Sequence, residues 1–365
     1  MNFSKTFSFY VIRKILTNLL LFFLAFALIS FIIDFLETIR ESQGKQILIS
    51  QIIKIVSYKI PFLLQSFIPF IFLFASISTF TKLNNDFEFA AAKSSGISIW
   101  SICIPITLMV VILSIFLITI FQPLSAIFLD NNRLLGIKYL DHKSKRVSLQ
   151  SNGIWLQDQT AEAKDNKIIS AQYVINQEKT LSDIKIYYAG VNQDYTVNYT
   201  AKTAAIKNHK LILTDVKKYT PDKEFQSYDY LELTTSLEPD QIKENIPHPD
   251  IIPFWQIKDF IQKIRKAGFS TLKHELYYQS MLATPLLYVS LVLIALSCSL
   301  NLPRKGKLGL VFITGGIIGI LVFFINKVSS VMALTGALPL TIAVLAPSVS
   351  YLFLSIAALI HCEEN

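Results

Sequence analysis

The stretch SDIKIYYAGVNQDYTVNYTAKTAAIK, residues 182–207, decides the architecture of this chain. Apolar and polar residues alternate on both sides of the turn-forming residues 192–194, which is the pattern of two half-buried strands joined by a turn. Similar patterns occur at 153–158, 167–176, 211–220 and 225–235. Their succession predicts an antiparallel sandwich or jelly roll, whose interior is either its own packed core or a space for acyl chains.

Long apolar segments lie on both sides of this polar block. Only 16% of the 365 residues are charged, against about 25% in soluble proteins. A helix of about 20 apolar residues crosses a hydrocarbon layer of about 30 Å. Candidate spans occur at 15–36, 62–80, 99–121, 280–302, 308–325 and 338–360. We therefore expect an α-helical integral membrane protein with six transmembrane helices in a 3+3 arrangement and an inserted all-β, jelly-roll-like periplasmic domain.

The expected domain organisation has three parts. Residues 1–133 hold the first three transmembrane helices, with a cytoplasmic coupling helix near 84–96. Residues 134–250 form the β domain. Residues 251–365 hold a connecting helix, which is expected to begin at Pro253 and to stop at Gly268, and the last three transmembrane helices. Before the second span, residues 46–59 are moderately amphipathic, and we expect them to lie along the membrane surface until Pro61 starts the span.

Basic residues in the short loops predict the orientation. The N-terminus shows no convincing signal-peptide cleavage site and is expected to be retained as the first span. Six alternating spans place three basic clusters on one side, which is cytoplasmic by the positive-inside rule. These residues are Lys5, Arg13, Lys14, Lys82, Lys93, Arg304, Lys305 and Lys307. Both termini are then cytoplasmic, and the β domain is on the other side.

The sequence carries no recognisable catalytic or nucleotide-binding signature. It has no P-loop, no HExxH, no CxxC and no GxSxG, and its five histidines are dispersed. The net charge of +8 comes without a nucleic-acid motif, so nucleic acid is not expected as a partner. We expect no enzyme, metal or cofactor in this chain, and any uphill movement of a substrate requires an energy source on another chain.

The segment between spans two and three is a candidate docking site for such a motor. Asp86, Phe87, Glu88 and Phe89 precede three alanines, and together they predict a helix of about two turns. One of residues 84–86 is expected to cap its start, and Gly96 to end it in a left-handed conformation. The two phenylalanines would fill an apolar groove on the motor, and the carboxylates would pair with basic residues there. A plain solvated turn is the alternative.

Acidic residues gather at the far end of span one. Asp34 lies inside or at the rim of the hydrocarbon, where an ionisable residue usually faces a cavity or a partner. Together with Glu37 and Arg40 it is a candidate lipid-binding site. The alternative is that Asp34 is merely solvated at headgroup level.

Several short motifs resemble one membrane family. The segment EFAAAKSSG, residues 88–96, resembles the E-x5-(A/S)-S-G coupling segment of the LptF/LptG family of lipopolysaccharide export permeases. Other matches are Trp100, Pro105, Gln122-Pro123, Gly153-Ile154-Trp155 and Ala346-Pro347. The resemblance covers essentially the whole chain, and the Gly-Ile-Trp strand favours the LptG branch.

This resemblance implies the permease subunit of an ABC transporter in the cell inner membrane. Such a subunit extracts lipopolysaccharide and passes it to a periplasmic bridge. The implied partners are an LptF-like permease chain, an LptB-like ATPase dimer that carries ATP and Mg, and an LptC-like bridge protein. Glu88 would contact the ATPase. Family members often carry a basic cluster at the outer end of span one, but here only Arg40 fits that pattern, so the role of this site in phosphate binding is open.

Two other readings of the sequence remain. A non-transporting inner-membrane scaffold could anchor the β domain without any ATPase partner. A membrane-bound enzyme acting on lipids is disfavoured, because no acid–base cluster is present.

Overall fold

The computed structural model divides the chain into two compact units. It describes residues 2–45, 47–140, 147–150, 153–158, 167–171, 173–175, 180–189, 195–207, 210–220, 223–235, 247–266, 268–301 and 308–364. One unit comprises residues 1–141, 250–255 and 275–365, and the other comprises residues 142–249 and 256–274. The predicted domain boundaries stay a prediction, and each unit is described by itself.

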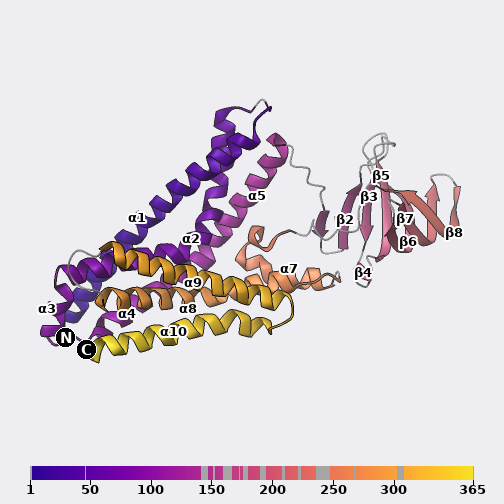
Figure 1. Cartoon of the computed structure of the whole chain (residues 1–365). Coiled ribbons are helices and arrows are strands. Elements are labelled where there is room, and N and C mark those ends of the chain that lie inside the picture. Colours follow the sequence, from indigo (N-terminus) through magenta and orange to yellow (C-terminus); the bar gives the residue numbers. More distant parts are fainter. Residues whose placement is uncertain are drawn as a thin grey trace. The chain divides into compact units, whose positions relative to one another are not determined.

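The first unit is a helical bundle (Figure 1). Its helices are α1 (Asn2–Glu41), α2 (Ile49–Asn85), α3 (Glu88–Ser94), α4 (Ile99–Phe116), the π-helical turn η1 (Leu117–Phe121), α5 (Gln122–Tyr139), α8 (Leu272–Asn301), α9 (Leu308–Leu334) and α10 (Leu340–Glu364). Six helical segments are long and apolar enough to cross a membrane, with α4, η1 and α5 forming one of them. The predicted six spans are confirmed.

Helix α2 differs from the sequence-based expectation at its start. The segment predicted to lie along the surface and the second span form one continuous helix, Ile49–Asn85, with Pro61 and Pro69 inside it. Burial explains the continuation, because Ile52, Ile55 and Val56 are each at most 4% exposed. A proline inside a membrane helix is tolerated when neighbouring groups satisfy the freed backbone.

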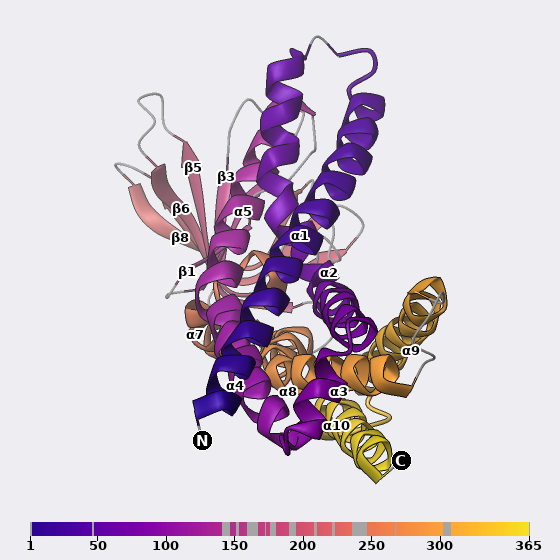
Figure 2. The same cartoon turned by 90° about the vertical axis from the view of Figure 1, so that its left-hand side faces the viewer.

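Helices α2 and α8 are the two most buried spans of the bundle. The rings of Phe72 and Tyr288 stack with their centroids 4.7 Å apart. Nearer the ends of the two helices, Thr81 Oγ1 donates to Ser299 Oγ at 3.2 Å, and the Asn84 side chain donates to the Ser299 carbonyl at 2.8 Å. Figure 2 shows the other spans around this pair. Aromatic stacking and polar contacts therefore both hold α2 against α8.

Glycines let α9 approach α2 closely. A Cβ added at Gly315 would overlap Ile77 Cδ1, whereas one added at Gly316 would meet nothing nearer than 3.8 Å, at Phe74 Cζ. Ile77 is fully buried and has little room to move. Small residues at such positions allow helix backbones to pack closely in membranes.

We predict that Gly315→Ala lowers the thermal stability of the detergent-solubilised protein, because overpacking a tight contact costs about 1–3 kcal/mol. Gly316→Ala is the matched control and is expected to leave the melting temperature unchanged or to raise it, since alanine favours helix. Melting followed by circular dichroism compares the two variants. Equal shifts in both would contradict the close approach.

The second unit contains one antiparallel sheet. Its strands are β1 (Val147–Gln150), β2 (Gly153–Asp158), β3 (Lys167–Ala171), β4 (Tyr173–Ile175), β5 (Thr180–Ala189), β6 (Tyr195–Lys207), β7 (Lys210–Thr220) and β8 (Lys223–Thr234). The order is β1-β2-β3-β5-β6-β7-β8, and β4 also pairs with β5. The inserted all-β domain is confirmed, and β1 is a strand that the sequence pattern did not indicate.

A row of positions that the strand pairing skips crosses four strands of this sheet and is called the crease below. The residue pairs on either side of it leave out one residue from each of β5, β6, β7 and β8: Asp183, Lys202, Asp215 and Asp229. Asp183 and Asp215 have φ of 49° and 54°, in the left-handed region that aspartate tolerates better than most residues. In β7 the alternation changes at this row, so that Leu213 and Val216 are both buried, whereas β5 keeps its alternation, with Ser182 and Ile184 buried on either side of Asp183.

A short helix follows the sheet in the chain. Helix α7 (Phe254–Lys266) comes after the 3-10 turn η2 (Pro249–Ile251) and buries Ile257, Ile261 and Ile264. Gly268 has φ of 80°, which confirms the predicted glycine stop. The next residue, Phe269, packs against the core of the sheet.

Candidate functional site

The predicted coupling helix exists and begins at an unusual residue. Phe87 connects α2 to α3 in a left-handed conformation, with φ of 58° and ψ of 14°. Its ring is 51% exposed. A non-glycine residue in this conformation is uncommon and is held there by its surroundings. Helix α3 lies at the end of the bundle where both chain termini lie (Figure 1).

The two phenylalanines of this segment have different surroundings. Phe89 is 8% exposed, and its ring lies 6.3 Å from the ring of Phe80 in the core of the bundle. The expectation that both rings face a partner is therefore not met for Phe89, because α3 needs an apolar anchor on its own chain. Phe87 remains exposed, and Asp86 is exposed beside it.

The expected capping of this helix needs a correction. The cap position of α3 is Phe87, and no side-chain hydrogen bond caps the helix there. Asn84 instead belongs to α2 and binds the carbonyl of Ser299. The expected stop is confirmed, because Gly96 has φ of 79°.

Glu88 is fastened to span one. Its Oε1 accepts a hydrogen bond from Lys14 Nζ at 2.9 Å and another from Tyr10 Oη at 3.0 Å. The Lys14 ammonium also lies 4.3 Å from the centre of the Tyr10 ring. The side chains of Lys14 and Glu88 are each 25% exposed, so this ion pair is partly buried. Any movement of α3 is thereby linked to the first turns of α1.

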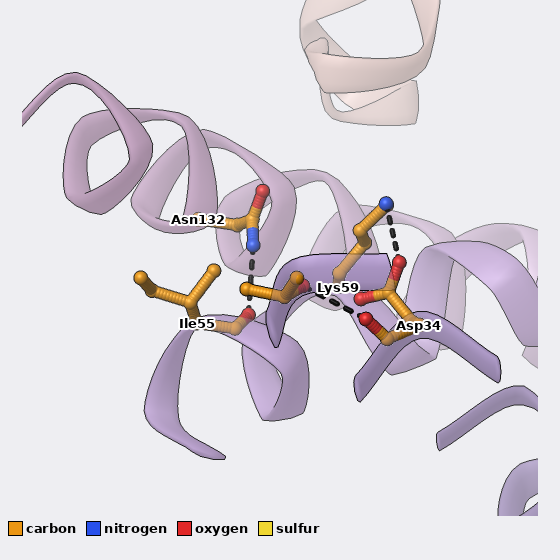
Figure 3. Close-up of polar contacts among 5 residues, drawn as sticks. Asp34, Ile55, Lys59 and Asn132 are labelled. Carbon is orange, nitrogen blue, oxygen red and sulfur yellow. Dashed lines mark hydrogen bonds and ion pairs between the residues drawn. The ribbon is translucent and has the colours of Figure 1, made fainter. Parts of the chain in front are cut away.

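A second charged site links the other ends of α1 and α2 (Figure 3). Asp34 is 2% exposed, and its Oδ1 accepts a hydrogen bond from Lys59 Nζ at 2.5 Å. Thr38 Oγ1 donates to the backbone carbonyl of Asp34 at 2.8 Å. Asp34 Oδ2 is buried and has no hydrogen-bond partner. The side chain of Lys59 is 34% exposed, so its ammonium is reachable from outside the pair.

Helix α5 also contacts α2 in this region. The Asn132 side chain donates to the carbonyl of Ile55 at 2.7 Å, as Figure 3 shows. The rings of Tyr58 and Phe128 meet edge to face, with centroids 5.5 Å apart. The Asp34–Lys59 pair therefore stands in a region where three helices are held together.

The structure does not gather the predicted lipid-binding residues into one cluster. Glu37 and Arg40 are exposed, whereas Asp34 is buried against α2. Sequence reasoning missed Lys59. It could have been found by counting outward from the turn between α1 and α2, since the two helices of a hairpin bring residues at similar distances from the turn side by side. Among the described residues, no three His, Cys, Asp or Glu side chains are placed to hold a metal ion.

Fold and site together define a polytopic α-helical membrane protein with an inserted antiparallel sheet and a short helix between spans two and three. The chain belongs to the lipopolysaccharide export system permease LptF/LptG family, whose model matches residues 9–361. It is similar to the lipopolysaccharide export system permease protein LptG of Escherichia coli strains K12 and O6:H1, with 23% identity over 210 residues in each case. These matches span 56% of this chain and 56% of the relative.

We predict that Lys59→Met destabilises the protein, because it leaves the Asp34 carboxylate buried without a cation. The loss is about 2 kcal/mol or more, as for other buried charged groups that lose their partner. Lys54→Met is the control, since Lys54 is an exposed lysine of the same helix. Thermal melting in detergent measures both variants.

The double variant Asp34→Asn with Lys59→Met is expected to recover part of the lost stability. Equal melting temperatures for Lys59→Met and Lys54→Met would show that Asp34 does not depend on Lys59.

Proposed function

We propose that this chain is the LptG-like permease subunit of an ABC transporter that extracts lipopolysaccharide from the inner membrane and passes it to a periplasmic bridge. Membership of the permease family over residues 9–361 is the observation that carries this proposal. The similarity to curated LptG proteins favours the LptG branch. The sequence has no P-loop, which supports the proposal that ATP and Mg are bound by a separate ATPase.

The proposed ATPase contact is the segment from Asp86 to Glu88. Phe87 offers an exposed ring at a fixed backbone position, which suits an apolar groove on a partner. Glu88 uses Oε1 for Lys14 and Tyr10, so its second oxygen is the one proposed to meet a basic residue of the ATPase. Phe89 acts within this chain as the anchor that keeps α3 on the bundle.

The proposed path of force runs from α3 into α1 and α2. Glu88 links α3 to α1 through Lys14, and α2 is connected to α3 by two residues, Asp86 and the left-handed Phe87. A push on α3 would therefore tilt both spans. At their other ends the Asp34–Lys59 pair joins them again, so the two helices would move together.

The proposed lipid contact at the outer end of the bundle differs from the expected set. Asp34 serves as the partner of Lys59, and it is the half-exposed Lys59 and the exposed Arg40 that offer positive charge to a phosphate. Glu37 is exposed near them and would need a divalent cation to join in binding an anionic headgroup.

The proposed assembly contains an LptF-like permease chain, an LptB-like ATPase dimer and an LptC-like bridge protein. The chain would be a multi-pass inner-membrane protein with both termini cytoplasmic and the sheet periplasmic. This orientation rests on the distribution of lysine and arginine in the short loops.

We predict that Glu88→Arg abolishes co-purification of the ATPase with this chain from mild detergent, because the new charge repels the basic partner and breaks the contact with Lys14. Phe87→Asp is expected to do the same through the apolar contact. The amount of ATPase recovered per permease measures the effect, with a loss of at least tenfold expected from about 1.4 kcal/mol or more of binding energy.

The matched control is Tyr10→Phe, which removes one hydrogen bond to Glu88 and keeps its charge and the Lys14 pair. It is expected to retain the ATPase. Full recovery of ATPase with both Glu88→Arg and Phe87→Asp would contradict the coupling role and favour a scaffold that only anchors the sheet.

A further inference from the structure

The third span contains a π turn in its interior. Residues Leu117–Phe121 form η1 between α4 and α5, and the amide of Gln122 donates to the carbonyl of Leu117, five residues back. Such turns inside a helix are rare and often mark functional positions. The residue four positions after Thr119 is Pro123, which has no N–H to offer the Thr119 carbonyl.

The missing donor is replaced from another part of the chain. The indole Nε1 of Trp255, in the first turn of α7, donates to the Thr119 carbonyl at 3.1 Å. Trp255 is 65% exposed, and its ring also meets the ring of Phe254 edge to face, with centroids 5.2 Å apart. An unsatisfied carbonyl is costly in a membrane, and Trp255 therefore has a specific reason to lie here.

The side chain of Gln122 completes the junction. Its Nε2 donates to the Ile252 carbonyl at 3.1 Å, and its Oε1 accepts from the Phe254 amide at 2.7 Å. Phe254 is the first residue of α7, and the residue before it, Pro253, has no side-chain oxygen with which to cap the helix. Gln122, which is 2% exposed, supplies that cap from span three.

The first turns of span four lie at the same junction. The Tyr277 hydroxyl is 3.5 Å from Gln122 Nε2, and the ring of Tyr278 stacks on the ring of Phe254 with centroids 5.9 Å apart. The side-chain amide of Gln122 thus connects span three to residues 252–255 and to span four. In the chain, these two spans are the ones that precede and follow the inserted sheet.

We propose that Gln122 is a positioning residue that holds the return segment, residues 252–255, against span three at the π turn, so that movement of span three is carried directly into this segment, where α7 begins. The hydrogen bonds of Gln122 depend on the π turn, which contains one residue more than an α-helical turn. Without that extra residue, Gln122 would be rotated by about 100° around the helix axis and would face another direction. The part of the proposal that concerns transport rests on the proposed function.

Hydrogen–deuterium exchange on the full chain in lipid nanodiscs tests the junction itself. Gln122→Met keeps the size of the side chain and removes its hydrogen bonds with Ile252, Phe254 and Tyr277, so peptides that cover residues 252–262 should exchange about fivefold to tenfold faster. Trp255→Phe should give a smaller increase. Gln279→Met is the matched control, because Gln279 belongs to span four and its buried Oε1 has no partner. Unchanged exchange in Gln122→Met, or an equal rise in Gln279→Met, would overturn the proposal.

A transport assay on the reconstituted complex distinguishes the loss of a positioning residue from a general loss of activity. Gln122→Met should keep the ATPase rate within twofold and raise the ATP hydrolysed per lipid released at least fivefold. A parallel fall of ATPase and lipid release would overturn the positioning role. Absence of lipid release from the wild-type complex would instead overturn the proposed function, and the exchange experiment would then decide the junction alone.

Discussion

Backbone groups that are freed where a helix is interrupted inside the membrane unit have to be satisfied by the chain itself, and this constraint shapes the bundle. Hydrocarbon offers no water to a free carbonyl or amide, so each interruption of a helix needs a partner from elsewhere. The π turn of span three finds Trp255 and Gln122, and the end of α2 binds Ser299 on α8. Contacts between distant parts of the sequence are thus formed at these interruptions.

A similar constraint applies to buried charged side chains, which need a partner within the chain. Asp34 is deeply buried and carries its cation, Lys59, on the neighbouring helix. Glu88 holds Lys14 and Tyr10 at the opposite end of α1. Span one is therefore fixed by charge near both of its ends, while the apolar stretch between them leaves large side chains such as Leu24 and Leu28 exposed. A helix held in this way can tilt as a unit and still present an apolar surface to lipid.

Features that depend on local pattern were predictable from the sequence. Apolar length predicted the six spans, alternation predicted most strands, and Gly96 and Gly268 ended their helices as expected. Pairings between distant residues were not predictable in this way. The Asp34–Lys59 pair depends on the geometry of a hairpin, and Phe89 turned inward because α3 is too short to hold itself on the bundle. Pro61 predicted a helix start, but tertiary burial of Ile55 and Val56 carried the helix through it.

The crease in the sheet restricts what can lengthen it. Strand β8 is paired only with β7 among the described strands, and Asp229 is its member of the creased row. In this row the left-handed residues Asp183 and Asp215 alternate with Lys202 and Asp229, so a strand added beyond β8 that continues the alternation would place a left-handed residue opposite Asp229. Glycine, asparagine or aspartate suits that place, whereas valine or isoleucine resists it. A strand can therefore pair along β8 only if its backbone has the matching irregularity. Flat strands made of β-branched residues throughout, which are typical of fibrils, fit this edge poorly.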